Sequence, residues 1–182
     1  MGISTEQGDS MASAFEAKLA ALAGLAPKVA AGRRERFQEV YEQNRHRIYA
    51  LAFWVTDHEM AAEELMTNAF YRAFVKSATP DSEAVDQAFI AEVRELMPVG
   101  LLTLEHDTCT EVLNARRNVK RVHLERAVVQ LPATEKLAFL MHDVEGYDHA
   151  RVARTLGISE AESQLGLHAA RVRVRQLVSA ME

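Results

Sequence analysis

The 182-residue chain contains a single cysteine, Cys109, and no long apolar run. One cysteine cannot form an intramolecular disulfide or a cysteine-based zinc site, which suits a protein kept in a reducing compartment. No apolar stretch approaches the length of a membrane span, and the N-terminal residues lack the basic-then-apolar order of a secretory signal. We therefore expect a cytoplasmic protein without a membrane segment.

The sequence also lacks the short motifs that carry common enzyme chemistry. Its seven histidines are scattered along the chain. It has no HExxH pair for a metal and no glycine-rich loop for phosphates. We expect no enzyme activity, no cofactor and no metal.

No long segment alternates apolar and polar residues as a half-buried strand would, so an all-α fold is predicted. Apolar residues instead recur every three or four positions, which predicts core-facing helices. In the first half we expect a helix from Arg33 to about Val55, a second helix opened by a Thr56–Glu59 capping box and ending near Ser77, and a third from about Ser82 to Leu96.

In the second half, a helix is expected to begin near Thr110 and to run through a basic segment to Gln130. The helices that follow are marked by residues that favour helix ends. These residues are Pro132 before a helix from Ala133, Gly146 at its end, Asp148 and Gly157 around a short helix, and Ser159 at the start of the last.

These elements predict two small helical domains joined by a linker. The expected boundaries are an N-terminal extension over 1–32, a first domain over 33–98, a linker over 99–123 and a second domain over 124–182. Seven side chains are predicted to lie in the two cores: Leu51, Leu65, Phe70, Leu140, Val152, Leu156 and Leu167.

Charge is distributed unevenly along the chain. Residues 57–95 contain nine acidic side chains against three basic ones, whereas residues 116–126 contain five basic against one acidic. A cluster of cations of this kind favours contacts with nucleic acid phosphates.

Two helices separated by a tight turn at Gly157, with Ser159 opening the second, are typical of a helix-turn-helix. The run LPATEKLAFLMHDVEGYDHARVARTLGIS, residues 131–159, resembles domain 4 of extracytoplasmic-function sigma factors of the sigma-70 family. The run FQEVYEQNRHRIYALAFWVTDHEMAAEELMTNAFYRAF, residues 37–74, resembles domain 2 of the same family.

This resemblance implies an initiation factor that attaches to core RNA polymerase and directs it to promoter DNA. It implies that the helix containing ELMTNAF binds the polymerase and that the last helix reads the promoter. The implied polymerase-binding residues are Glu63, Glu64, Thr67, Asn68 and Arg72. The DNA-binding candidates on the last helix are Ser163, Gln164, His168, Arg171, Arg173 and Arg175. The charge distribution adds Arg116, Arg117, Lys120 and Arg121 of the basic segment as candidate phosphate contacts, with solvated surface charges as the alternative for Arg116 and Arg117.

The resemblance also implies that the third helix captures the melted promoter strand, and the chain departs from the family pattern in all three helices. Thr67 and Asn68 replace the usual Gln and Glu, and Glu95 and Leu96 replace an Arg-Asn pair in a segment whose acidic charge disfavours a DNA strand. In the last helix, relatives tend to have Thr, Lys and Arg where this chain has Glu162, Gln164 and Gly166.

Glu162 has a structural explanation, since it forms a capping box with Ser159. Gly166 has none, because it costs a helix about 1 kcal/mol relative to Ala and supplies no side chain. An alternative function is therefore a sigma-like protein that has weakened or lost promoter binding and acts through protein contacts, such as binding an anti-sigma factor.

Spacing also divides the last helix into two apolar rows. Ser163, Leu167, Ala170, Val174 and Leu177 form a row that should face the core. Leu165, Ala169 and Val172 form a second row, which is a candidate protein interface: another domain of the chain, a second copy or an anti-sigma partner could pack there. The other possibility is that Leu165 packs beside the preceding helix.

Overall fold

The computed structural model describes residues 27–77, 79–104 and 120–181. Within these ranges every regular element is a helix, which confirms the predicted all-α class. None of the described helices combines the length and hydropathy needed to cross a membrane. The chain divides into two compact units, with the boundary between Glu92 and Val93.

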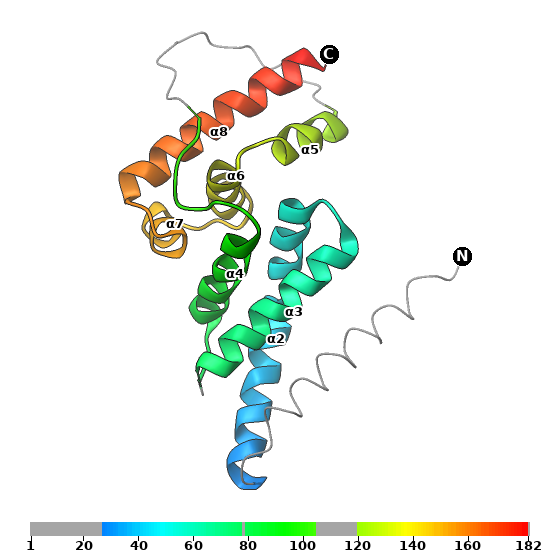
Figure 1. Cartoon of the computed structure of the whole chain (residues 1–182), viewed down its shortest axis with the longest axis vertical. Coiled ribbons are helices and arrows are strands. Elements are labelled where there is room, and N and C mark those ends of the chain that lie inside the picture. Colours follow the sequence, from blue (N-terminus) through cyan, green and yellow to red (C-terminus); the bar gives the residue numbers. More distant parts are fainter. Residues whose placement is uncertain (1–26, 78, 105–119, 182) are drawn as a thin grey trace, which may run out of the picture. The chain divides into compact units, whose positions relative to one another are not determined.

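The first unit contains α2 (Pro27–Thr56), α3 (Glu59–Lys76) and most of α4 (Ser82–Leu96), shown in Figure 1. Aromatic side chains join α2 to α3. The Phe37 and Phe74 rings stack with their centroids 4.4 Å apart, and Tyr41 meets Phe70 edge-on at 4.9 Å. Offset and edge-to-face pairs of this kind add stability beyond the area that they bury.

One ion pair lies inside the first unit. The Asp86 carboxylate on α4 is buried and accepts a hydrogen bond from the Arg47 guanidinium on α2. Arg47 also donates to the side-chain oxygen of Asn44 (2.7 Å), and Asn44 donates to the Val40 carbonyl (2.8 Å). This network satisfies polar groups that would otherwise be costly to bury.

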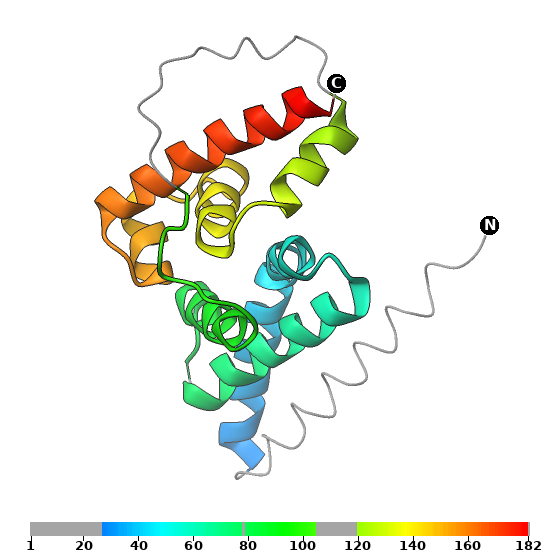
Figure 2. The same cartoon turned by 45° about the horizontal axis from the view of Figure 1, so that its top comes forward.

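The second unit contains α5 (Arg121–Val129), α6 (Ala133–Phe139), a π-helical turn η1 (Leu140–Val144), α7 (His149–Leu156) and α8 (Glu160–Ala180). Helices α5, α6 and α7 all pack against the long helix α8, which Figure 1 and Figure 2 show spanning the unit. Residues 97–104 also belong to this unit.

Most predicted helix ends are confirmed, including those of α4, the start of α6 and both ends of α7. The predicted core is confirmed as well, since Leu51, Leu65, Phe70, Leu140, Val152, Leu156 and Leu167 are all buried. The first helix begins earlier than expected, at Pro27. The expected start of a helix near Thr110 lies outside the described residues, and the predicted linker range stays a prediction.

The predicted Thr56–Glu59 capping box is wrong. Helix α2 continues through Thr56, whose hydroxyl donates back to the Ala52 carbonyl (2.9 Å). The chain reverses at Asp57, which has φ 50°, and His58 caps α3 by accepting the Ala61 N–H at Nδ1 (3.4 Å). Thr56 therefore ends one helix, where a serine or threonine hydroxyl often bonds to the preceding turn.

The π-helical turn was not predicted. In it the N–H of Glu145 donates to the Leu140 carbonyl (3.0 Å), a bond that spans five residues where an α-helix spans four. Gly146 follows with φ 72°, as the sequence predicted for the end of this helix.

Candidate nucleic-acid interface

Helices α7 and α8 form a helix-turn-helix whose ends are fixed by local hydrogen bonds. Asp148 accepts the Arg151 N–H (2.7 Å) and opens α7, and Gly157 ends it with φ 68°. Ser159 and Glu162 form the predicted capping box, with the Ser159 N–H 2.7 Å from Oε2 of Glu162. Because these contacts need only neighbouring residues, the sequence predicted them correctly.

The two helices are joined to their own core by apolar side chains. Val152, Ala153 and Leu156 of α7 and Leu167 of α8 are all buried. The turn carries a further contact: a guanidinium nitrogen of Arg94 donates to the Leu156 carbonyl (2.7 Å). A cation at the C-terminal end of α7 is favoured by the dipole of the helix.

Residues 121–174, from the start of α5 to the middle of α8, match the family model described as "Sigma-70, region 4". No curated protein matches the chain. The second unit contains a sigma-70 region 4 domain. The match agrees with the helix-turn-helix geometry of α7 and α8.

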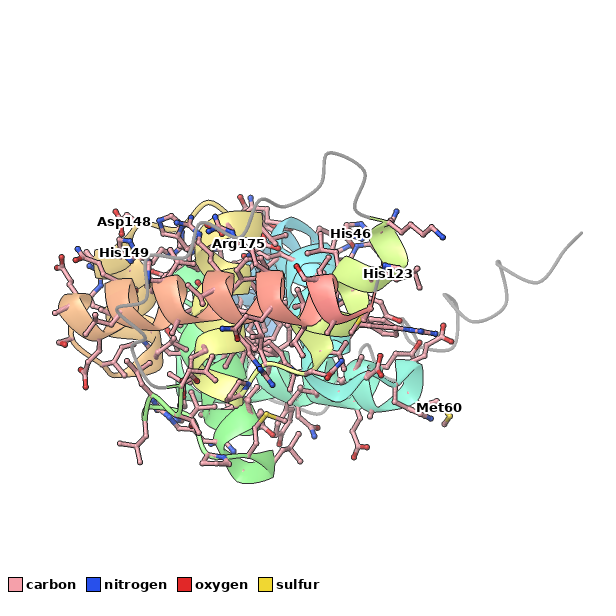
Figure 3. All side chains as sticks on the ribbon, turned by 90° about the horizontal axis from the view of Figure 1, so that it is seen from above. His46, Met60, His123, Asp148, His149 and Arg175 are labelled. Atoms are coloured by element: carbon pink, nitrogen blue, oxygen red, sulfur yellow. The ribbon has the colours of Figure 1, made fainter. Side chains whose placement is uncertain are left out.

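The structure places most of the predicted DNA-binding residues on the surface of the region 4 domain. Seven of these predicted residues are exposed: Lys120, Arg121, Gln164, His168, Arg171, Arg173 and Arg175. Arg116 and Arg117 lie outside the described residues. Figure 3 shows Arg175 on α8, with Asp148 and His149 near the N-terminal end of that helix. The exposed cations of this predicted set are therefore divided between the start of α5 and the second half of α8.

Ser163 is placed differently from Gln164. Its side chain is only 1% exposed, and its hydroxyl is hydrogen-bonded to Nδ1 of His149 on α7 (3.0 Å). The hydroxyl therefore does not face solvent, where a base edge would have to reach it. Ser163 instead continues the inner row of α8 with Leu167, Ala170 and Val174, which are all buried.

Arg171 is exposed but already paired. Its guanidinium binds both oxygens of Asp143 on the π-helical turn, at 2.6 and 2.9 Å. Hydrogen bonding to Arg171 holds the pKa of the Asp143 carboxyl below its usual range. A DNA phosphate would have to share this guanidinium with Asp143, so Arg171 is a weaker candidate contact than its exposure alone suggests.

Two histidine rings stack beside this ion pair. The His142 and His149 centroids are 4.5 Å apart, and His142 Nδ1 lies 2.9 Å from Asp143. Burial, followed by the nearby His142 and Arg171, lowers the pKa of His149. Glu160 and Asp148 oppose this shift but do not reverse it.

This environment predicts that the region 4 domain loses stability in mild acid. Because the folded-state pKa of His149 lies below its ordinary value of 6.5, the unfolded chain takes up the proton first as pH falls. The stabilising contribution is complete above about pH 6.5 and decreases as pH drops toward the folded-state pKa. Urea unfolding followed by circular dichroism at pH 7.5 and 5.5 measures this decrease.

The His149→Gln variant should show a smaller loss of stability on acidification than the wild type. His46→Gln, at an exposed position of the first unit, is the matched control and should behave like the wild type. An unfolding midpoint that does not change with pH in the wild type would contradict the prediction.

The residues implied to bind polymerase all lie on α3. Glu64 is exposed, Glu63, Thr67, Asn68 and Arg72 are partly exposed, and Arg72 pairs with Glu92 on α4. Sequence reasoning missed their apolar neighbours. Met60, Tyr71 and Val75 are large exposed side chains on the same helix, and Figure 3 shows Met60 extending away from it. Successive steps of three or four residues could have revealed this face: Met60, Glu64, Asn68, Tyr71 and Val75.

The candidate apolar row on α8 is not uniformly exposed. Leu165 is 42% exposed, Val172 is intermediate and Ala169 is only 8% exposed.

Sequence reasoning also missed α7 as a source of cations. Arg151 lies over the Tyr147 ring (3.7 Å to the centroid), and Arg154 is exposed one turn later. The first helix of a helix-turn-helix crosses the DNA backbone, so the basic residues in the sequence of α7 could have indicated phosphate contacts.

No group of three or more His, Cys, Asp or Glu side chains in the described part of the chain is arranged to hold a metal ion.

Proposed function

We propose that this protein is a sigma factor of the extracytoplasmic-function type, which acts in the cytoplasm and directs core RNA polymerase to promoters without doing covalent chemistry. The observation that carries the proposal is the region 4 domain with its capped helix-turn-helix over residues 148–180. We further propose that residues 33–98 form its domain 2 and bind the polymerase.

The surface of α3 supports the proposed polymerase contact. Apolar Met60, Tyr71 and Val75 are exposed beside the acidic Glu64 and the polar Asn68. A mixed surface of this kind suits a protein partner, because large exposed apolar side chains gain stability when covered and the polar ones set orientation. The same surface suits DNA poorly, since it offers no cluster of cations.

A direct test is to mix the protein with core RNA polymerase and to measure both complex formation and run-off transcription from a genomic promoter library. Glu64→Arg should weaken the complex. Glu35→Arg reverses the charge at an exposed position of α2 and is the matched control. Failure of the wild type to form a complex or a transcript would refute the proposal.

DNA binding should depend on the exposed cations of the region 4 domain. Removing one cation that binds a phosphate flattens the plot of log affinity against log salt by about 0.9. Replacing Lys120, Arg121, Arg171, Arg173 and Arg175 with glutamine should therefore weaken binding to duplex DNA and reduce its salt dependence. Fluorescence anisotropy over a salt series measures both.

Arg34→Gln and Arg36→Gln, at exposed positions of α2, are the matched controls for this change. They should leave both affinity and salt slope unchanged. If the five substitutions on α5 and α8 leave affinity and slope unchanged as well, DNA does not bind this surface.

A second candidate function is a sigma-like protein that acts through protein contacts, such as an anti-sigma factor. Leu165, 42% exposed on the helix proposed to read DNA, favours it. Leu165→Glu should abolish such a contact and leave the region 4 domain folded. Unfolding of the domain in this variant would instead assign Leu165 to the core.

A further inference from the structure

Gly166 lies under a segment from elsewhere in the second unit. A Cβ atom built on Gly166 would be 2.7 Å from a terminal methyl of Leu102, closer than two such carbons can approach. Gly166 therefore provides the space in which Leu102 packs against α8. This contact explains a residue that costs the helix stability and has no local explanation in the sequence.

Residues 99–104, here called the strap, reach α8 by way of α6. The N–H of Gly100 donates to the Thr134 hydroxyl (3.1 Å). The N–H groups of Thr103 and Leu104 both donate to Oε1 of Glu135, at 2.5 and 2.6 Å. Figure 1 and Figure 2 show the strap, in green, running beside α6 toward α8.

The attachment at Glu135 is strong in one respect and weak in another. Hydrogen bonds from two amides to one carboxylate oxygen are charge-assisted, and the first turn of α6 favours an acidic side chain. However, Glu135 is 0% exposed and its second oxygen is buried without a hydrogen-bond partner in the described residues. This oxygen regains hydrogen bonds when water reaches it, which offsets part of the free-energy cost of releasing the strap.

The strap lies on a flank of α8 that DNA would need. Glu162, Gly166, Ala169 and Arg173 share this flank, because they are three or four residues apart. A helix with its side chains is about 10–12 Å across and fills a major groove about 12 Å wide, so its flanks meet the phosphate walls. A segment bound along one flank of α8 therefore occupies the space that the phosphate backbone on that side of the groove would need.

The chemistry of the strap also opposes DNA binding. Its sequence, VGLLTL, carries no charge. Leu101 is 79% exposed, so the strap presents an apolar surface where a phosphate backbone requires cations or hydrogen-bond donors.

We propose that the strap is an autoinhibitory element that competes with duplex DNA for the Gly166 flank of α8, so that DNA binds the region 4 domain only when the strap is released. This inference rests on the DNA binding proposed above. If the strap is docked in most molecules, the apparent affinity for DNA equals the intrinsic affinity multiplied by the fraction of molecules in which the strap is free.

The test uses the full chain and a fluorescein-labelled duplex of mixed sequence, about 30 base pairs long, which exceeds the spacing of two successive major grooves. Leu102→Ala empties the space at Gly166, and Gly166→Ala fills it while raising helix propensity. Both variants should bind the duplex about tenfold more tightly, the factor expected if the strap is free in about a tenth of wild-type molecules. Leu101→Ala, in the same segment but exposed, is the matched control and should bind like the wild type.

Amide hydrogen exchange at Thr103 and Leu104 provides a readout that does not depend on DNA. Both amides should be protected in the wild type and the control, and should exchange faster in the two strap variants. Exchange in the wild type at the rate of an unstructured peptide would overturn the docked strap.

The DNA measurements separate the remaining outcomes. Tighter binding by both strap variants supports the proposal, even if the wild type alone binds too weakly to detect. Equal, measurable binding by all four proteins overturns competition and leaves the proposed function standing. Absence of binding by every variant overturns both the competition and the proposed DNA contact.

Discussion

Replacing Leu156 with alanine should destabilise the second unit by about 2–5 kcal/mol, the range measured for leucine-to-alanine changes in protein cores. Leu156 is fully buried where α7 turns toward α8. The substitution removes apolar contacts and leaves a cavity that the two helices cannot easily close. Urea unfolding followed by circular dichroism measures the change in free energy of unfolding.

The single tryptophan, Trp54, lies on α2 of the first unit and serves as the fluorescence reporter of that unit. In Leu156→Ala, the Trp54 fluorescence transition should stay at its wild-type urea midpoint while part of the helical signal disappears earlier. A change below about half a kcal/mol would mean that Leu156 does not hold the motif together, because surface substitutions fall in that range. An equal shift in Trp54 fluorescence would mean that the two units unfold together.

Replacing Asp86 with alanine should destabilise the first unit by about 3–5 kcal/mol, because it leaves a charge without its partner inside the protein. Asp86 is 1% exposed, and Arg47, which pairs with it, is mostly buried too. The loss should appear in the Trp54 fluorescence transition, the reverse of the pattern expected for Leu156→Ala.

Arg47 offers the control for this change. The double variant Arg47→Met, Asp86→Ala removes both charges and should recover part of the stability that Asp86→Ala removes, because no unpaired charge remains. If the single and double variants are equally unstable, the loss comes from packing around Asp86 and the ion-pair explanation is wrong.

The location of the predicted DNA-binding residues shows where sequence reasoning reached its limit. Exposure of Gln164, Arg173 and Arg175 follows from the helical period and was predicted correctly. Spacing also predicted that Ser163 faces the core, but its hydrogen bond to His149 and the pairing of Arg171 with Asp143 involve residues 14 and 28 positions away. Periodicity within one helix carries no information about such partners.

The sequence by itself determined the elements whose causes are local. Asp148, Gly157 and the Ser159–Glu162 pair fix the ends of α7 and α8 through bonds between residues at most four positions apart, and the apolar period fixes which faces of the helices are buried. Only the tertiary structure decided the role of Gly166. Its missing side chain destabilises the helix when α8 is considered alone, but it leaves the space that a methyl of Leu102, from a distant segment, occupies. Contacts between distant segments depend on how the chain is folded, so no local pattern could have indicated that glycine's partner.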